Sequence, residues 1–188
     1  MTEVPNPYAV DADTLTGEMR PVRRGVLSLG SNLGDRMANL EGALATISDT
    51  PDLWITAVSP VYETSPIDAP EESENFYNIV VLIDTTLSVH RLLERLLLVE
   101  DSLGRFRTGV PNGPRTLDID IVVVGDRVAN EPDLTLPHPR AHERAFVLAP
   151  WHDIEPNAVI PGVGPIAELL AGLDTSVVVR RDDLVLDF

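Results

Sequence analysis

The strand that decides the fold reads LDIDIVVV and runs from Leu117 to Val124. Its β-branched residues predict the strongest strand of the chain. Side chains two apart on a strand point to the same face, so Asp118 and Asp120 are predicted to project together. Two adjacent carboxylates repel one another, and a divalent cation between them removes that repulsion. The pair therefore indicates a metal site, unless the strand simply carries two solvated acids at an edge.

The elements around this strand follow the order β-α-β-β-α-β. Strands are expected at residues 26–29, 54–61, 77–82 and 117–124, and helices after Asp35 and after Ser88. This order predicts a ferredoxin-like α/β (α+β) sandwich, in which two helices cover one face of a sheet.

A C-terminal helical and hairpin appendage is expected beyond this unit. Residues 134–139 are extended, residues 143–149 and 166–173 favour short helices, and residues 177–181 and 184–187 favour a hairpin. Residues 1–24 show no periodicity and contain three prolines, so they are expected to form a flexible N-terminal tail. Residues 25–188 are then one domain.

The charge of the chain excludes several classes of partner. Among 188 residues there are 30 acids and 14 bases, every base is arginine, and the formal net charge is −16. Nucleic acids and anionic membranes require positive fields, so neither is expected to bind. The chain has no cysteine, which is compatible with a cytoplasmic location.

One segment departs from this acidic composition. Residues 104–116 contain Arg105, Arg107 and Arg115 without any acid, and they lead directly into Asp118. Guanidinium groups bind phosphate oxygens in bidentate fashion, and phosphoryl transfer relies on positioning and charge stabilisation. The combination favours a phosphate site beside the metal pair, although the arginines could instead offset nearby acidic surface.

A second cationic cluster reads PHPRAHER, from Pro137 to Arg144. A proline between His138 and His142 disfavours the helical spacing that a two-histidine metal site would need. We therefore expect His138 and Arg144 to form a phosphate clamp near a helix start, and assign no role to His142.

An aromatic pair gives a third candidate group. Phe76 and Phe146 are two of only four phenylalanines, and Asn78 stands close to the first. Two rings can stack on a flat heterocycle while an amide contacts its polar edge. The alternative, that both rings are ordinary core residues, is the commoner situation.

These motifs together resemble the 6-hydroxymethyl-7,8-dihydropterin pyrophosphokinase family of folate biosynthesis, also called 2-amino-4-hydroxy-6-hydroxymethyldihydropteridine diphosphokinases. The resemblance spans about residues 26–173. It rests on GPRTLDIDI (113–121), LGSNLG (29–34), YETSP (62–66), FYN (76–78), GR (104–105), LPHP (136–139) and RAFVL (144–148).

The resemblance implies transfer of pyrophosphate from ATP to the pterin hydroxymethyl group, with release of AMP. It implies catalytic roles for Arg105, Arg115, Asp118 and Asp120, the two aspartates holding two Mg²⁺ ions. It places ATP at Glu100, Arg107, Arg115, Ile121, Thr135, His138 and Arg144. It places the pterin at Thr64, Ser65, Ile67, Phe76, Asn78 and Phe146.

Two departures from the family pattern bear on function. The family usually has a basic residue and a tryptophan where this chain has Pro111 and Asn112, and a base where it has Asp133. A catalytically weak or silent pterin- or nucleotide-binding module is therefore an alternative, as is another Mg-dependent phospho- or nucleotidyltransferase. A monomer is expected, with possible contacts to neighbouring folate-pathway enzymes.

Overall fold

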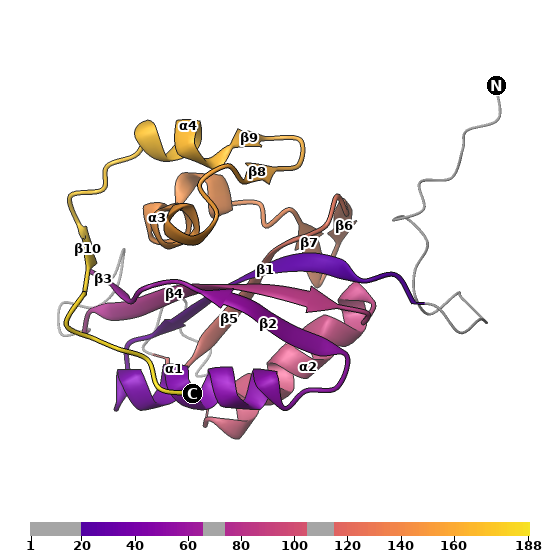
Figure 1. The fold of residues 1–188 in the computed structure, drawn as a ribbon, viewed down its shortest axis with the longest axis horizontal. Coiled ribbons are helices and arrows are strands. Elements are labelled where there is room, and N and C mark those ends of the chain that lie inside the picture. Colours follow the sequence, from indigo (N-terminus) through magenta and orange to yellow (C-terminus); the bar gives the residue numbers. More distant parts are fainter. Residues whose placement is uncertain (1–19, 66–73, 105–114) are drawn as a thin grey trace.

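A computed structural model describes residues 20–65, 74–104 and 115–188 of the chain (Figure 1). The strands of the main sheet are β1 (Arg23–Ser31), β2 (Leu53–Val58), β3 (Tyr62–Thr64), β4 (Phe76–Thr85), β5 (Asp118–Val124) and β10 (Val178–Arg180). Two small hairpins pair β6 (Ala129–Glu131) with β7 (Leu134–Leu136) and β8 (Val159–Ile160) with β9 (Gly164–Pro165). The helices are α1 (Arg36–Ser48), α2 (Val89–Ser102), α3 (Ala145–Ile154) and α4 (Ile166–Ala171), with a 3-10 turn, η2 (Ala141–Glu143).

The main sheet confirms the predicted ferredoxin-like fold. Its order is β10-β3-β4-β1-β5, with β2 also paired to β4, and every pairing is antiparallel. The expected single stretch 54–61 forms two strands, because Pro60 lacks the amide hydrogen that a continuous ladder needs. β2 pairs with the second half of β4 and β3 with the first half.

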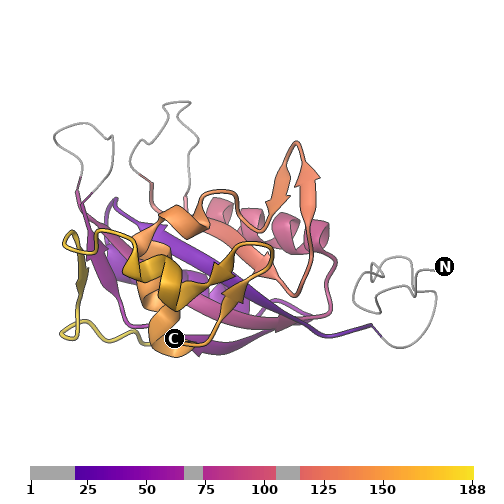
Figure 2. The same cartoon turned by 90° about the horizontal axis from the view of Figure 1, so that it is seen from above.

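Helices cover both faces of the sheet (Figures 1 and 2). α1 and α2 lie on one face, where Leu27, Leu44 and Leu92 belong to the larger hydrophobic cluster. The predicted helix starts are confirmed, since Asp35 accepts a hydrogen bond from Ala38 N at 3.0 Å and Ser88 caps α2. The sequence predicted only these two covering helices.

The other face is closed by the C-terminal part of the chain. α3 and α4 pack there over a second cluster around Trp151, Leu148 and Val80. The helix expected at 143–149 is η2 followed by α3, because Arg144 between them has an extended backbone (φ −111°, ψ 101°). The helical part of the appendage thus completes the sandwich.

The predicted C-terminal hairpin is wrong. Val178–Arg180 forms β10, which pairs with β3, and residues 184–187 form no strand. An isolated two-stranded hairpin is marginally stable, whereas pairing with β3 extends a sheet that is already formed. Leu184 and Leu186 are free to pack against the larger cluster instead.

The N-terminal boundary also differs from the prediction. β1 begins at Arg23, inside the expected 1–24 tail, while residues 1–19 lie outside the described part of the chain. The division into a tail and a 25–188 domain otherwise stays a prediction. In the residues that the structure describes, no helix has the length and apolar character needed to cross a membrane.

Candidate active site

The two aspartates of β5 lie on one face of the sheet, as predicted. Ile119 and Ile121 belong to the hydrophobic cluster under α1 and α2. Because side chains alternate along a strand, the carboxylates of Asp118 and Asp120 point to the opposite face. The register places Gly30 of β1 opposite Asp118 and Ser28 opposite Asp120. These small neighbours leave open space beside the carboxylates, where a ligand can lie.

Two arginines and one histidine surround the carboxylates. Arg115 NH1 lies 2.5 Å from Asp118 Oδ2, and Arg144 NH1 lies 3.2 Å from Asp120 Oδ2. His138 Nε2 is 3.7 Å from the same Asp120 oxygen. The structure thus brings Arg115 near the same pair of aspartates as His138 and Arg144 of the second cationic cluster.

Burial perturbs the protonation of this group. Burial, reinforced by the charge of Asp118, raises the pKa of Asp120 above its ordinary value. Burial also lowers the pKa of His138, although the nearby Asp120 carboxylate acts in the opposite direction. Desolvation and repulsion by Asp118 therefore outweigh the stabilisation that His138 and Arg144 give to the charged form of Asp120.

The donor set suits Mg²⁺ bound together with phosphates. Within the described ranges, no group of three or more histidine, cysteine or acidic residues could hold a metal ion by itself. Mg²⁺ commonly takes one or two carboxylates and completes its shell with water and substrate phosphate. Asp118 and Asp120 offer hard carboxylate oxygens from neighbouring positions on one face of β5, so they fit that ion.

A cavity of about 520 Å³ opens beside Asp118. It joins two groups of predicted residues, one for the phosphates and one for the heterocycle. The phosphate group on its wall comprises Arg115, Asp118 and Arg144, and the heterocycle group comprises Thr64, Ser65, Phe76, Asn78 and Phe146. Segments that lie far apart in the sequence therefore form one continuous site.

The heterocycle end of the cavity is built on β3, β4 and α3. Asn78 is buried and donates a hydrogen bond from Nδ2 to Thr64 Oγ1 at 2.8 Å, which fixes its amide. A Cβ atom on Gly30 would lie only 3.0 Å from Asn78 Oδ1 and 3.5 Å from a Phe76 ring carbon. Glycine at this position keeps the space beside the amide oxygen and the ring open.

Several predicted residues lie away from this wall. Glu100 is only 2% exposed and accepts a hydrogen bond from Ile119 N at 2.7 Å, so it holds β5 between the two aspartates. Ile121 lies in the core, and Thr135 pairs with Asn130 in the β6–β7 hairpin. Three predicted residues, Arg105, Arg107 and Ile67, fall outside the described part of the chain.

The sequence analysis missed one residue at the base of the site. Asn32 is buried, its Oδ1 accepts from Arg115 N at 2.8 Å, and its Nδ2 donates to Glu74 O at 3.4 Å. Its backbone amide also donates to Arg115 O at 3.1 Å. The LGSNLG motif contains Asn32, but neither contact partner is close to it in sequence.

Further residues on the cavity wall had no predicted role in the site. Arg140 and Glu143 come from the cationic segment before α3. Leu173, Asp174, Val177 and Val178 come from the C-terminal part of the chain. Nothing in the local sequence of 173–178 indicated that these residues would reach the sheet.

Comparison with known proteins identifies the family. The family model described as 7,8-dihydro-6-hydroxymethylpterin-pyrophosphokinase (HPPK) matches residues 26–156. A 2-amino-4-hydroxy-6-hydroxymethyldihydropteridine pyrophosphokinase of Methylorubrum extorquens is 41% identical over 157 residues, covering 84% of this chain and 98% of the relative. The protein of the same name from Pseudomonas aeruginosa is 37% identical over 150 residues, covering 80% and 91%.

Solved structures agree on the fold. A Plasmodium falciparum HPPK-DHPS triple mutant superposes with a TM-score of 0.64 at 17% identity, over 82% of this chain and 44% of the other. The wild-type HPPK-DHPS with pterin and p-hydroxybenzoate gives 0.63 at 17% identity, over 84% and 42%. This chain thus spans less than half of those proteins. The sequence matches confirm the predicted family resemblance and the predicted pyrophosphokinase function. The chain belongs to the 7,8-dihydro-6-hydroxymethylpterin-pyrophosphokinase family.

Proposed function

We propose that the cavity beside Asp118 is where this pyrophosphokinase transfers the pyrophosphoryl group of ATP to 6-hydroxymethyl-7,8-dihydropterin. The observation that carries the proposal is the single cavity that joins a heterocycle end at Asn78 to a cationic end at Arg115. A substrate bound at one end presents its hydroxymethyl group toward the other. Proximity of the two reactants is the main requirement of phosphoryl transfer.

The heterocycle end would bind the pterin. Phe76 and Phe146 offer ring faces to the flat bicycle, and Asn78 offers an amide whose Nδ2 already bonds to Thr64. The Asn78 Oδ1 is then the acceptor left for a donor on the edge of the pterin. Ser65 and the predicted contribution of Ile67 would complete this end.

The charged end would bind the triphosphate. Asp118 and Asp120 are the residues that would hold Mg²⁺, and we propose two ions; when bound, they neutralise phosphate charge and polarise the β-phosphorus. Arg115 and Arg144 lie beside these carboxylates and can turn their guanidinium groups to phosphate oxygens. His138 would add a further hydrogen-bond donor. The other proposed contacts of ATP are Glu100, Arg105, Arg107, Ile121 and Thr135.

The bond changes are those of a direct displacement. The pterin hydroxymethyl oxygen bonds to the β-phosphorus of ATP, and the bond from that phosphorus to the oxygen bridging the α-phosphate breaks. AMP leaves with the electron pair, and the hydroxyl proton passes to water. Arg115 contributes by stabilising charge on the transferring group, so it acts most strongly in the transition state.

A coupled assay tests the proposal through its products. We expect purified protein with ATP, Mg²⁺ and 6-hydroxymethyl-7,8-dihydropterin to release AMP, and to release none without the pterin. Release of pyrophosphate would indicate nucleotidyl transfer instead. Binding of both ligands without release of AMP would indicate a catalytically silent module, an alternative that Asn112 in place of the usual tryptophan specifically suggests.

We also propose a cytoplasmic location and a monomeric state. Light scattering would test the monomeric state.

A further inference from the structure

The C-terminal strap, residues 177–188, lies beyond the residues that the family model matches. It descends from α4, follows the edge of the sheet at β3, and ends beside α1 on the opposite face (Figure 1). Its first two residues, Val177 and Val178, line the heterocycle end of the cavity. Its last part is fixed to α1 by a hydrogen bond from Asp187 N to Glu41 Oε1 at 3.1 Å.

β10 holds the strand that carries Thr64. The antiparallel register sets Val178 opposite Thr64 and Val179 opposite Glu63, and Arg181 N donates to Val61 O at 2.8 Å. Thr64 in turn accepts the hydrogen bond from Asn78. The strap is therefore one hydrogen-bonded strand away from the amide proposed to contact the pterin edge.

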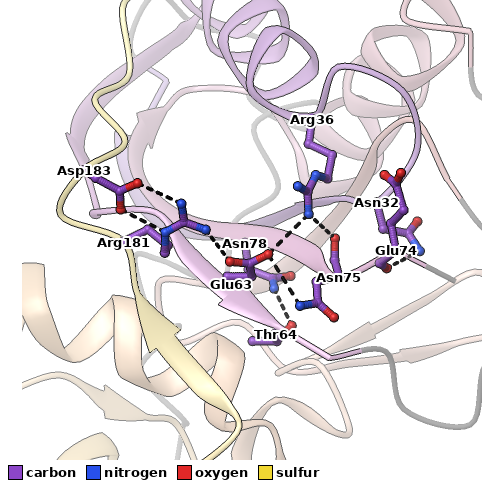
Figure 3. Close-up of polar contacts among 9 residues, drawn as sticks. All are labelled: Asn32, Arg36, Glu63, Thr64, Glu74, Asn75, Asn78, Arg181 and Asp183. Atoms are coloured by element: carbon purple, nitrogen blue, oxygen red, sulfur yellow. Dashed lines mark hydrogen bonds and ion pairs between the residues drawn. The ribbon is translucent and has the colours of Figure 1, made fainter.

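Behind the cavity, Glu63 is the centre of an ion-pair network (Figure 3). Arg181 NH1 pairs with Glu63 Oε2, and the same guanidinium group pairs with Asp183 at 2.7 Å. Arg36 NH1 lies 3.5 Å from Glu63 Oε1 and donates to Asn75 O at 2.7 Å. Because Glu63 and Asn75 lie on β3 and just before β4, the network joins the two strands that meet at the heterocycle end.

The same two arginines flank an aromatic ring. The Arg36 guanidinium carbon lies 3.7 Å from the Tyr77 ring centroid, and that of Arg181 lies 5.8 Å from it. Tyr77 is buried and stands between Phe76 and Asn78 in β4. Cation–π contacts at this position add to the ion pairs in fixing the start of β4.

We propose that Arg181 is a positioning residue for pterin binding. It touches neither the cavity nor the predicted phosphate site; it fixes Glu63, and through β3 it fixes the Thr64–Asn78 pair. Without the Arg181 guanidinium group, Glu63 keeps its contact with Arg36 but loses its side-chain link to the strap, which is then held near β3 by backbone hydrogen bonds. The heterocycle end then loosens, while Asp118 and Arg115 on the far side of β1 keep their contacts.

The test compares ligand affinities in Arg181→Ala, Arg181→Lys and the wild type. Dissociation constants are measured by calorimetry for the pterin, in the presence of an ATP analogue with an α,β-methylene bridge, and for that analogue alone. We expect Arg181→Ala to weaken pterin binding by about two- to fivefold, the upper part of the range of a partly exposed ion pair, and analogue binding by less than about twofold. Lysine keeps one charge opposite Glu63 and should restore part of the loss.

Two further variants separate positioning from general stability. Arg24→Ala removes a surface ion pair with Glu155 of 2.7 Å, distant from β3, and should leave both affinities unchanged. Glu63→Gln removes the same network from its other partner and should reproduce the pterin-selective loss even if Arg181→Ala folds poorly. Equal weakening of both ligands, or unchanged pterin binding in Arg181→Ala and Glu63→Gln, would overturn the inference.

The inference rests on the proposed pterin site, and the two can fail separately. Wild-type protein that binds no pterin would refute the proposed function. Wild-type protein that binds pterin and forms AMP, with no selective effect of Arg181→Ala or Glu63→Gln, would refute only the role of the strap.

Discussion

Replacing Gly30 with alanine should weaken pterin binding selectively. The new Cβ would lie 3.0 Å from Asn78 Oδ1 and 3.5 Å from the Phe76 ring, so the amide must move by a few tenths of an ångström. Asn78 cannot move freely, because its Nδ2 bonds to Thr64 at 2.8 Å. Losing or bending that buried hydrogen bond costs about 0.5–1.5 kcal/mol, and the methyl group also occupies space beside the proposed pterin.

This free energy corresponds to a loss of about two- to tenfold in pterin affinity. The steady-state assay follows AMP at saturating ATP while the pterin concentration is varied, and then at saturating pterin while ATP is varied. The KM for the pterin should rise by that factor, while the KM for ATP stays within about twofold, because the described atoms within 4 Å of the new Cβ belong to Asn78 and Phe76.

Gly42→Ala is a matched control on α1. Its Cβ would lie 3.1 Å from Leu103 Cδ2, a comparably tight contact, but against a flexible side chain away from the cavity. The control should leave both KM values unchanged. If Gly30→Ala leaves the pterin KM unchanged, or raises both KM values together, the assignment of Asn78 and Phe76 to the pterin end is refuted.

The remaining predictions concern the charged end and the sheet edge. Asp118→Asn keeps the shape of the side chain but removes the charge of a proposed metal ligand. The rate of AMP release should therefore fall at least about a hundredfold at any Mg²⁺ concentration. Activity restored by added Mg²⁺ would contradict an essential role of the Asp118 carboxylate. Asn32→Ala leaves the backbone amide of Arg115 without the side-chain acceptor that lies 2.8 Å away. The kcat should therefore fall about tenfold, with little change in the affinity for the ATP analogue. An effect on KM alone would refute the role of Asn32 in positioning Arg115. Burial and a hydrogen bond to Asp153 raise the pKa of Tyr62 to about 12 from 10.0. The stability that this raised pKa contributes is present below pH 10.0 and is lost as pH rises through about 12. Urea unfolding of Tyr62→Phe should therefore show a smaller alkaline fall in the free energy of unfolding than the wild type does. Equal falls in the two proteins would contradict this prediction.

The sequence predicted the ferredoxin-like unit because its signals are local. Asp35 and Ser88 stand directly before apolar residues at helical spacing, and the β-branched run of β5 is continuous. The end of the chain lacked such a signal. Val178–Arg180 forms a strand only because β3 offers a free edge, and that edge is more than a hundred residues away in sequence. Pairings of this kind depend on tertiary contacts and not on propensity.

The candidate site likewise has one part that the sequence could predict and one part that it could not. Asp118 and Asp120 could be placed on one face from the two-residue period of a strand, and the structure confirms that placement. Asn32 could not be assigned, because its partners are the Arg115 backbone and Glu74 O, both distant in sequence. The residue roles themselves stay predictions, which the substitutions above address.

The acidic composition of the chain shapes how the charged end works before substrate arrives. Arg115 and Arg144 are each paired with a carboxylate, so their guanidinium groups are already held in the cavity wall in place of being spread over a surface with net charge −16. In the proposed function, a bound triphosphate would compete with Asp118 and Asp120 for these arginines. Its charge exceeds that of one carboxylate, and it can accept both arms of a guanidinium fork. The aspartates would thus keep the arginines in position without preventing that exchange. The side-chain entropy of ordering the arginines would then be lost on folding and not on binding.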